Sequence, residues 1–271
     1  MRPPLAANAR MYAVNAAASA AWAELFGWVA QASGVALSVI DHAAPAPLEA
    51  LWRRGDLGLA FICGLPFGRG DFPLRAVAAP VPASPLGAGR PVYATHFIVR
   101  GDSAIAALAD SFGRRIGWTA EHSQSGFSAP ARHLRGLSQG GARLYAEAVG
   151  PLQTPRRVIE AVLAGEIEIG PLDSYFHDLL LAHEPKTAAR LRIVATTQPT
   201  PMPVLAASAT LDVKTTGLLR RVLVAAGETP AAAPLLARLR LAGFAPAEPA
   251  AYRGLAEADA AIRAVGVEGL F

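Results

Sequence analysis

Residues 51–64 read LWRRGDLGLAFICG, and a closely similar stretch recurs later in the chain. Residues 162–174 read VLAGEIEIGPLDS, with the same order of helix end, glycine, acid, apolar strand and small or polar turn. The segments that precede them also echo, since RMYAVNAAASAAWAELF begins at Arg10 and RIGWTAEHSQSGFSAPA begins at Arg115. Repetition of a whole strand-and-helix unit predicts two lobes of similar construction.

Strand-like and helix-like segments alternate around these repeats, which is typical of parallel α/β units. Strands are predicted at 10–14, 36–40 and 57–63, and helices near 16–33 and 47–54. The longer helix carries Trp22, Phe26 and Val29 at helical spacing, so these side chains are expected in the core. Gly34 follows it, where a left-handed residue ends a helix most cheaply.

Two further segments look like crossings between lobes. PVYATHFIV (91–99) is extended, and RIVATTQPTPMPVLAAS (192–208) holds two strand-like runs divided by prolines, which remove backbone donors. We therefore expect crossings near 92–97 and 196–203. One lobe would comprise residues 1–96 and 198–271, and residues 97–197 would form the inserted lobe. The alternative is one continuous doubly wound sheet.

Composition excludes several classes of protein. The chain is 52% hydrophobic and 17% charged, and it has no uncharged apolar run long enough to cross a bilayer, so a soluble globule is expected. The net charge of +4 comes from scattered arginines, so no nucleic-acid partner is expected. Cys63 is the single cysteine and cannot form an intramolecular disulfide. The start, MRPPLAANARMYAVNAA, lacks the continuous apolar run of a secretory signal.

Two serines and a glycine stand where a strand-like run gives way to a helix predicted over about 126–141. These residues are Ser123, Ser125 and Gly126, within GWTAEHSQSGFSAPARHL (117–134). Hydroxyls and N-terminal amides at the start of a helix suit an anion. The alternative for each serine is simple N-capping of that helix.

Two echoing lobes, two crossings and a Ser-x-Ser-Gly helix start together resemble the type II periplasmic binding proteins. The resemblance is specifically to the phosphate- and phosphonate-binding subunits of ABC importers, and it covers nearly the whole chain. The segments that carry it are ANARMYAVNAAASAAWAELFGWVA, PAPLEALWRRGDLGLAFICGLPF, HSQSGFSAPARHL and GEIEIGPLDSYFHDLL. It implies a two-lobed α/β fold with two hinge crossings.

The same resemblance implies a function. A solute-binding protein of this kind is not an enzyme, needs no cofactor, and captures a small oxyanion in the cleft between its lobes. Its partners would be the membrane subunits of an ABC importer, and we expect a monomer. The family implies a periplasmic location, with the cytoplasm as the alternative because no export signal is evident.

The resemblance also implies ligand contacts at particular positions. On the first predicted crossing these are Tyr93 and Thr95. In the inserted lobe they are Ser123, Ser125, Gly126, Phe127, Asp173, Ser174 and Tyr175, and in the other lobe they are Tyr12, Cys63 and Gly64. Asp173 would pair with an ammonium group on the ligand, although Asp173 or Ser174 could equally be an N-cap. The alternative for Tyr12 is a core tyrosine, and for Cys63 a buried structural thiol.

The main rival is an enzyme on the same scaffold, acting on a small carboxylated substrate as in menaquinone or thiamine-precursor pathways. Its candidate acids and bases are Asp173, His96 and His122. A serine-hydrolase elbow is not formed around Ser125, whose neighbours two positions away are Ser123 and Phe127. His177 and His183, six residues apart on a helix, would make a poor metal pair, so no metal is expected. A soluble sensor ranks last.

Overall fold

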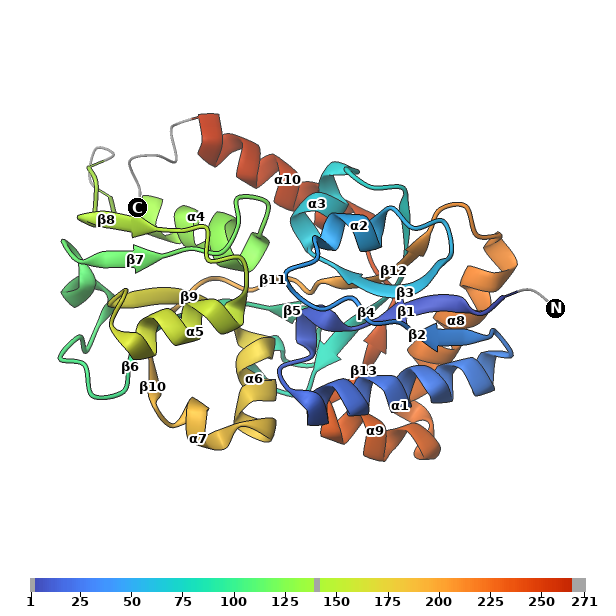
Figure 1. Cartoon of the computed structure of the whole chain (residues 1–271). Helices are drawn as coiled ribbons and strands as arrows, with labels where there is room; N and C mark the ends of the chain where they lie inside the picture. Colours follow the sequence, from blue (N-terminus) through green and yellow to red (C-terminus); the bar gives the residue numbers. More distant parts are fainter. Residues whose placement is uncertain (1–2, 139–141, 265–271) are drawn as a thin grey trace. The chain divides into compact units, whose positions relative to one another are not determined.

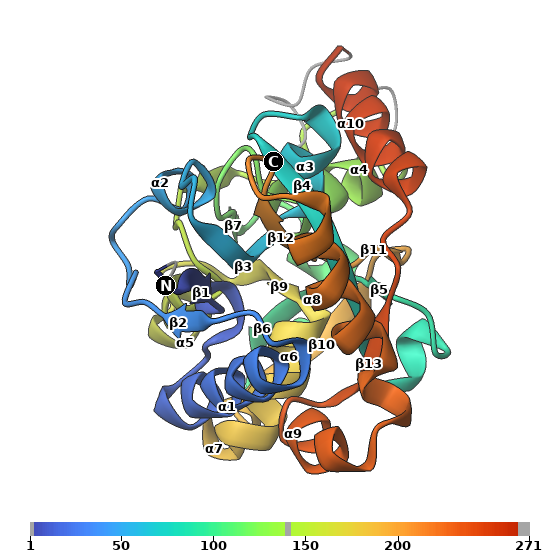
Figure 2. The same ribbon diagram turned by 90° about the vertical axis from the view of Figure 1, so that its right-hand side faces the viewer.

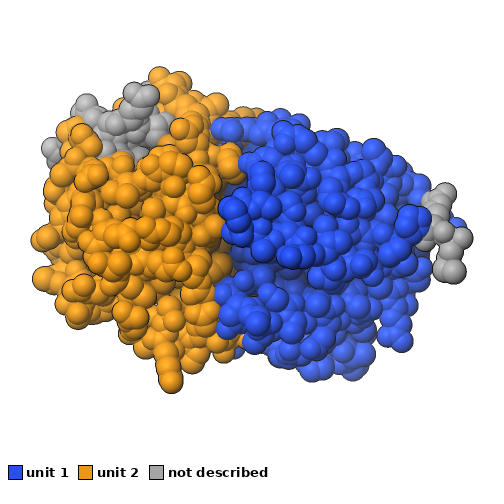
Figure 3. Space-filling view, viewed as in Figure 1, with its two compact units in different colours: residues 1–92, 201–252 blue, residues 93–200, 253–271 orange. Residues whose placement is uncertain are grey.

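The computed structural model describes residues 3–138 and 142–264, which divide into two compact units (Figures 1 and 3). Unit 1 comprises the chain up to Val92 and Pro201–Tyr252, and unit 2 comprises Tyr93–Thr200 and the chain from Arg253 onward. The chain therefore passes between the units at residues 92–93, 200–201 and 252–253. The last passage places the segment after Tyr252 with unit 2, whereas the predicted boundaries assign it to the first lobe.

Unit 1 is built on a six-stranded sheet in the order β13-β4-β12-β3-β1-β2. Its strands are β1 (Leu5–Asn8), β2 (Leu37–Val39), β3 (Leu57–Ile62), β4 (Leu74–Pro82), β12 (Val204–Ser208) and β13 (Leu241–Ala245). β1 pairs in parallel with β2 and β3, while β12 runs antiparallel to β3 and β4. The carboxyl ends of β1, β2 and β3 consequently lie at one edge of the sheet.

Helices cover both faces of this sheet (Figure 2). They are α1 (Ala16–Ser33), α2 (Leu48–Trp52), α3 (Gly64–Arg69), α8 (Val213–Ala225) and α9 (Ala233–Arg238), with 3-10 turns η1 (Arg10–Tyr12), η2 (Pro85–Gly87), η6 (Ala226–Glu228) and η7 (Pro230–Ala232). Trp22 of α1 packs edge-on against Phe61, with ring centroids 5.0 Å apart. Leu51 of α2 packs with Ala60. Because adjacent strand residues point to opposite faces, β3 is buried on both sides.

Local signals account for the ends of α1. The Ala18 N–H donates to the Asn15 side chain at 3.0 Å, and Gly34 ends the helix with φ of 68°. These observations confirm the helix predicted at 16–33. The strand predicted at 10–14 is wrong, because the strand lies at Leu5–Asn8 instead. The Arg10 N–H donates to the Asn8 side chain at 2.9 Å, and this local bond turns the chain out of the sheet.

Unit 2 is built on a five-stranded sheet in the order β10-β6-β9-β7-β8. Its strands are β6 (Thr95–Arg100), β7 (Arg115–Gly117), β8 (Glu147–Val149), β9 (Ile169–Asp173) and β10 (Leu191–Thr196). β7 pairs in parallel with β8 and β9, and β6 runs antiparallel to β9 and β10. A separate pair of short strands, β5 (Val92–Tyr93) and β11 (Thr200–Pro201), contains the residues where two of the passages occur.

The helices of unit 2 again lie on both faces of its sheet. They are α4 (Ala129–Arg135), α5 (Pro155–Ala164), α6 (Ser174–His183), α7 (Pro185–Ala188) and, from residue 253, α10 (Pro249–Ala264), with the 3-10 turn η3 (Leu108–Ser111) and the π-helical turn η4 (Gln124–Ser128). Ile169 of β9 belongs to a core cluster with Phe127 and Leu134. The neighbouring Gly170 faces Val158 of α5, so α5 covers the opposite face.

The helix predicted over about 126–141 is replaced by η4 followed by α4, which ends at Arg135. Residues 139–141 of that prediction lie outside the described residues. The two apolar strands of the sequence repeat, β3 and β9, belong to different sheets. This confirms a two-lobed α/β fold and excludes the alternative of one continuous sheet.

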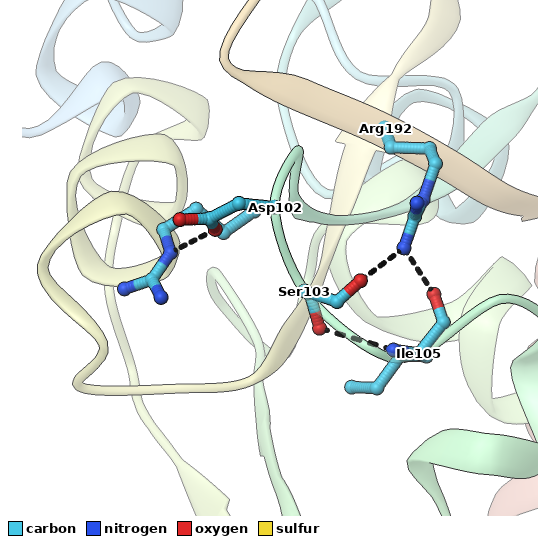
Figure 4. A network of polar contacts seen from close by, with 5 residues as sticks. Asp102, Ser103, Ile105 and Arg192 are labelled. Atoms are coloured by element: carbon cyan, nitrogen blue, oxygen red, sulfur yellow. Dashed lines mark hydrogen bonds and ion pairs between the residues drawn. The ribbon is translucent and has the colours of Figure 1, made fainter.

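Backbone carbonyls after β6 are held by a single arginine on β10 (Figure 4). Arg192 Nη2 donates to the carbonyl oxygens of Ser103 at 2.6 Å and Ile105 at 2.7 Å. The Ile105 N–H in turn donates to Ser103 Oγ at 3.2 Å. This network anchors the loop at the end of unit 2 where β6 finishes.

Candidate anion-binding site

One edge of the unit 2 sheet combines the ends of its parallel strands with three helix starts. β7, β8 and β9 run in the same direction, and each is followed by a helix: η4 with α4, then α5, then α6. The N-cap residues are Ser123, Thr154 and Asp173, and each accepts a backbone N–H bond through its side chain. Helix N-termini carry partial positive charge, so this edge favours an anion.

The two serines of the η4 turn have different roles. Ser123 Oγ accepts the Gly126 N–H at 3.0 Å, so Ser123 is the N-cap. Ser125 is half-buried, and its carbonyl accepts a hydrogen bond from Thr95 Oγ1 at 2.9 Å. Within residues 3–138 and 142–264, no hydrogen bond of the Ser125 hydroxyl is formed. Ser125 is therefore the serine whose hydroxyl is available to a ligand.

A threonine that the sequence did not single out lies beneath this turn. Thr119 is only 5% exposed, and its N–H donates to the Gly126 carbonyl at 3.1 Å. Its Oγ1 has no hydrogen-bond partner in the described part of the chain. A Cβ on Gly126 would lie 1.8 Å from that oxygen, so this position requires glycine. Thr119 follows β7 by two residues, and its place after a parallel strand is the signal that could have identified it.

Thr95 connects the η4 turn to the neighbouring strands. It stands at the start of β6, directly opposite Asp173 in the antiparallel register with β9. Its Oγ1 holds the Ser125 carbonyl, and its N–H donates to Thr197 Oγ1 at 3.0 Å. The structure thus brings Thr95, Ser125 and Asp173, which are far apart in sequence, to the same edge of the sheet.

Asp173 caps helix α6. Its Oδ1 accepts the N–H groups of Tyr175 at 2.8 Å and Phe176 at 3.0 Å. Ser174 is tied to the residue just before β6, because its Oγ accepts the Ala94 N–H at 3.0 Å. Asp173 therefore caps α6, and this cap holds its carboxylate at the edge described above.

The two predicted tyrosines of unit 2 are enclosed. Tyr93 is 1% exposed and Tyr175 has no exposed surface. Burial, followed by the charges of Asp178 and Asp173, raises the pKa of the Tyr175 hydroxyl well above its usual range. The Tyr175 side chain is consequently protonated at neutral pH and packed within the protein.

In unit 1, Tyr12 lies in the turn η1 after β1, and Cys63 and Gly64 directly follow β3. The Tyr12 ring packs edge-on against Phe61, with centroids 4.9 Å apart, and is 1% exposed. Cys63 is buried and precedes helix α3, which begins at Gly64. Tyr12 is therefore a core tyrosine and Cys63 a buried thiol, as the alternatives to ligand contact for these two residues predict.

The first turn of α5 brings two cations near the same edge, and both are occupied. Arg156 pairs with Glu184 at 2.6 Å, and Arg157 pairs with Glu166. The donors that we assign to an anion are therefore neutral hydroxyls and amides. Among the described residues, no group of three His, Cys, Asp or Glu side chains is placed to hold a metal ion.

His96, a candidate base of the enzyme alternative, lies on β6 next to Thr95 and so points to the other face of the sheet. Its Nδ1 is 2.8 Å from Thr196 Oγ1, and its ring packs edge-on against His177 with centroids 5.5 Å apart. Burial, reinforced by His177, lowers the pKa of His96 to about 4. It is therefore neutral at physiological pH. His122 is half-buried, directly before the N-cap Ser123.

A hollow of about 280 Å³ at the other end of the unit 2 sheet has charged walls that are already paired. Arg100 pairs with Asp102, and Glu168 pairs with Arg115 at 2.7 Å. Because these charges satisfy one another, the hollow does not compete with the η4 turn as an anion site.

Solved type II periplasmic binding proteins share this two-unit α/β fold, and it is the fold of this chain. A binding-protein component of an ABC phosphonate transporter from Pseudomonas aeruginosa has a TM-score of 0.78 at 15% identity, covering 96% of this chain and 87% of that one. PhnD1 from Prochlorococcus marinus in complex with methylphosphonate scores 0.76 at 17% identity, covering 96% and 98%. A Xanthomonas citri protein bound to ATP scores 0.65 at 22% identity, covering 97% and 98%.

The family described as ABC transporter, phosphonate, periplasmic substrate-binding protein matches residues 13–252, and the chain belongs to it. It is the phosphonate-binding component of an ABC transporter. The family consists of non-enzymatic, periplasmic substrate-binding proteins, which confirms the predicted class over the enzyme alternative. No curated protein matches the chain. In the described part of the chain, no helix has the length and apolar character needed to cross a membrane.

Proposed function

We propose that this chain captures a small phosphorus oxyanion, a phosphonate or phosphate, at the η4 turn and delivers it to the membrane subunits of its importer. The Ser125 hydroxyl carries this proposal, because it has no partner in the described residues and stands where η4 begins. The buried Thr119 Oγ1, likewise without a hydrogen-bond partner in the described residues, lies against the next residue, Gly126.

The chemistry of these groups suits an oxyanion. A hydrogen bond to a charged acceptor contributes about 1.5–3 kcal/mol, so two or three hydroxyl or amide donors account for useful affinity. The partial charge at a helix N-terminus adds roughly 0.3–1 kcal/mol, and more where the site is shielded from water. Neutral hydrogen-bond donors can bind either the singly or the doubly ionised form of a phosphonate. A fixed cation in the site would instead favour the dianion.

Two solved relatives by fold hold phosphorus oxyanions of different size. The Prochlorococcus protein holds methylphosphonate, and the Xanthomonas protein holds ATP. Their common chemistry is a tetrahedral phosphoryl group, and we place that group at the Ser125 hydroxyl, on the turn that Ser123 caps. We propose Asp173 as the partner of an ammonium group where the ligand is an aminoalkyl phosphonate. The other contacts in the proposal are the predicted residues of unit 2 at the same edge, Thr95, Gly126, Phe127 and Ser174.

The proposal extends to the setting in which the protein works. Membership of a periplasmic family supports action in the periplasm, and its importer's membrane subunits would receive the ligand. The paired or scattered arginines do not form a basic stripe, which supports the absence of a nucleic-acid partner. We propose that the protein acts as a monomer, which sedimentation of the purified chain would check.

Titration calorimetry of the purified protein tests the ligand class. The panel comprises methylphosphonate, 2-aminoethylphosphonate, inorganic phosphate, ATP and methanesulfonate. We expect binding of the small phosphorus oxyanions, and at about 100 times Kd the native state should gain roughly 2.7 kcal/mol against thermal unfolding. Binding of none of the phosphorus compounds would refute the proposal.

A matched pair of variants ties binding to the turn. The double variant Ser123→Ala with Ser125→Ala should lose most of the affinity for methylphosphonate. Ser103→Ala removes a hydroxyl from the opposite end of the same unit and should bind like the wild type. Equal affinity of the double variant and the wild type would return both serines to a structural role.

A further inference from the structure

Most of α10, from residue 253 onward, lies beyond the region that matches the family. The match ends at residue 252, whereas α10 continues to Ala264. Ile262 packs against the unit 2 core cluster that includes Phe127, Ala131 and Leu134. A segment beyond the matched residues thus packs against the core cluster that includes Phe127 of the turn at which we place the ligand.

Arg263 makes the polar contacts between this segment and the turn. Its Nη2 donates to the Glu121 carbonyl at 2.7 Å, and its Nη1 lies 3.7 Å from Glu121 Oε2. Its guanidinium carbon stands 5.3 Å from the centroid of the Phe127 ring, in a cation–π arrangement. Its Nε donates at 2.8 Å to Asp259, whose side chain is 1% exposed. The guanidinium is therefore braced from its own helix.

We infer that Arg263 is a positioning residue for the oxyanion-binding turn. Glu121 precedes the N-cap Ser123, and Phe127 directly follows Gly126, so one guanidinium holds both ends of the segment that carries Ser123 and Ser125. Holding both ends reduces the conformational freedom that the turn would otherwise lose when the ligand binds. This inference rests on the proposed function.

The contacts distinguish bracing from simple electrostatic attraction. Arginine presents a planar fork that reaches a carbonyl, a carboxylate and an aromatic face together, whereas lysine offers one compact charge. If Arg263 acts by bracing, Arg263→Lys retains the charge yet does not restore the affinity. If it acts only as a nearby positive charge, the lysine variant binds like the wild type.

Calorimetric titration with methylphosphonate tests the inference on Arg263→Met and Arg263→Lys. We expect Kd to rise about tenfold in Arg263→Met, the scale of ordering one or two side chains. Arg263→Lys should show the same rise in Kd as Arg263→Met. If the methionine variant does not fold, the lysine variant still tests the inference. The matched control is Arg192→Met, which removes an arginine bonded to two carbonyls of unit 2 outside the turn. It should lower the melting temperature and leave Kd unchanged.

A double-mutant cycle with Ser125→Ala separates positioning from general stability. Because Arg263 acts through the turn, its effect on Kd should shrink once the Ser125 hydroxyl is gone. Wild-type Kd in Arg263→Met or Arg263→Lys, alongside weakened binding in Ser125→Ala, would overturn the inference and leave the proposed function intact. Wild-type Kd in Ser125→Ala would remove the proposed site, and the inference with it.

Discussion

The two serines of the η4 turn should respond differently to truncation, because only one of them has an internal partner. Ser123 Oγ accepts the Gly126 N–H at 3.0 Å, and Ser128 N–H donates to the Ser123 carbonyl at 3.0 Å. The Ser125 hydroxyl has no such bond within the described residues. Stability should therefore depend on Ser123, and ligand affinity on Ser125.

The magnitudes follow from these contacts. Ser123→Ala removes an N-cap and should cost about 1 kcal/mol of unfolding free energy, roughly 2–4 °C in melting temperature for a chain of this size. Ser125→Ala should change the unfolding free energy by less than about 0.5 kcal/mol. Loss of its bond to a charged ligand should cost about 1.5–3 kcal/mol of binding, a rise in Kd of about tenfold to a hundredfold.

Urea unfolding without ligand and calorimetric titration with methylphosphonate measure the two quantities separately. Both variants have the same side chain removed from positions two residues apart, so each is the control for the other. If Ser125→Ala destabilises the protein as much as Ser123→Ala does and binds with wild-type affinity, the assignment of the free hydroxyl to the ligand is refuted.

Three further predictions concern single positions. Gly126→Ala should cost about 1–3 kcal/mol of stability, since its Cβ would stand 1.8 Å from Thr119 Oγ1, and Thr119→Ala should restore part of that loss in urea unfolding. Burial lowers the pKa of His96 to about 4 from 6.5, so the folded protein disfavours the charged ring. The unfolding free energy should therefore be highest above pH 6.5 and fall by about 3 kcal/mol as the pH drops to 4. The fall should be smaller in His96→Gln, as urea unfolding across this pH range would show. Asp173→Asn retains the α6 cap, so the unfolding free energy should change little. The affinity for 2-aminoethylphosphonate should decrease, and that for methylphosphonate should not. An equal loss of affinity for both ligands would exclude an ammonium contact.

Features that depend on neighbours in sequence could be read from the chain. The capped helix α1 follows from the apolar spacing and from Gly34, and the buried run at β3 follows from its continuous apolar residues. The repeat of β3 in β9 predicted two lobes, and Ser123 and Asp173 were recognisable as helix caps. Capping bonds join residues two or three positions apart, so local sequence is sufficient to predict them. The first strand, predicted at 10–14, lies instead at Leu5–Asn8, and the Arg10 N–H bond to the Asn8 side chain follows directly after it.

Contacts between distant segments were decided only by the tertiary structure. Thr95 holds the carbonyl of Ser125 from 30 residues away, and Arg263 reaches Glu121 across 142 residues. Thr119 lies against Gly126 because β7 and the η4 turn fold back on each other. No periodicity encodes such meetings: strand order and register bring these groups together, and many chain arrangements share the same local preferences. Which serine hydroxyl stays free for a ligand is therefore a property of the packed sheet edge, while the presence of two serines at a helix start is a property of the sequence.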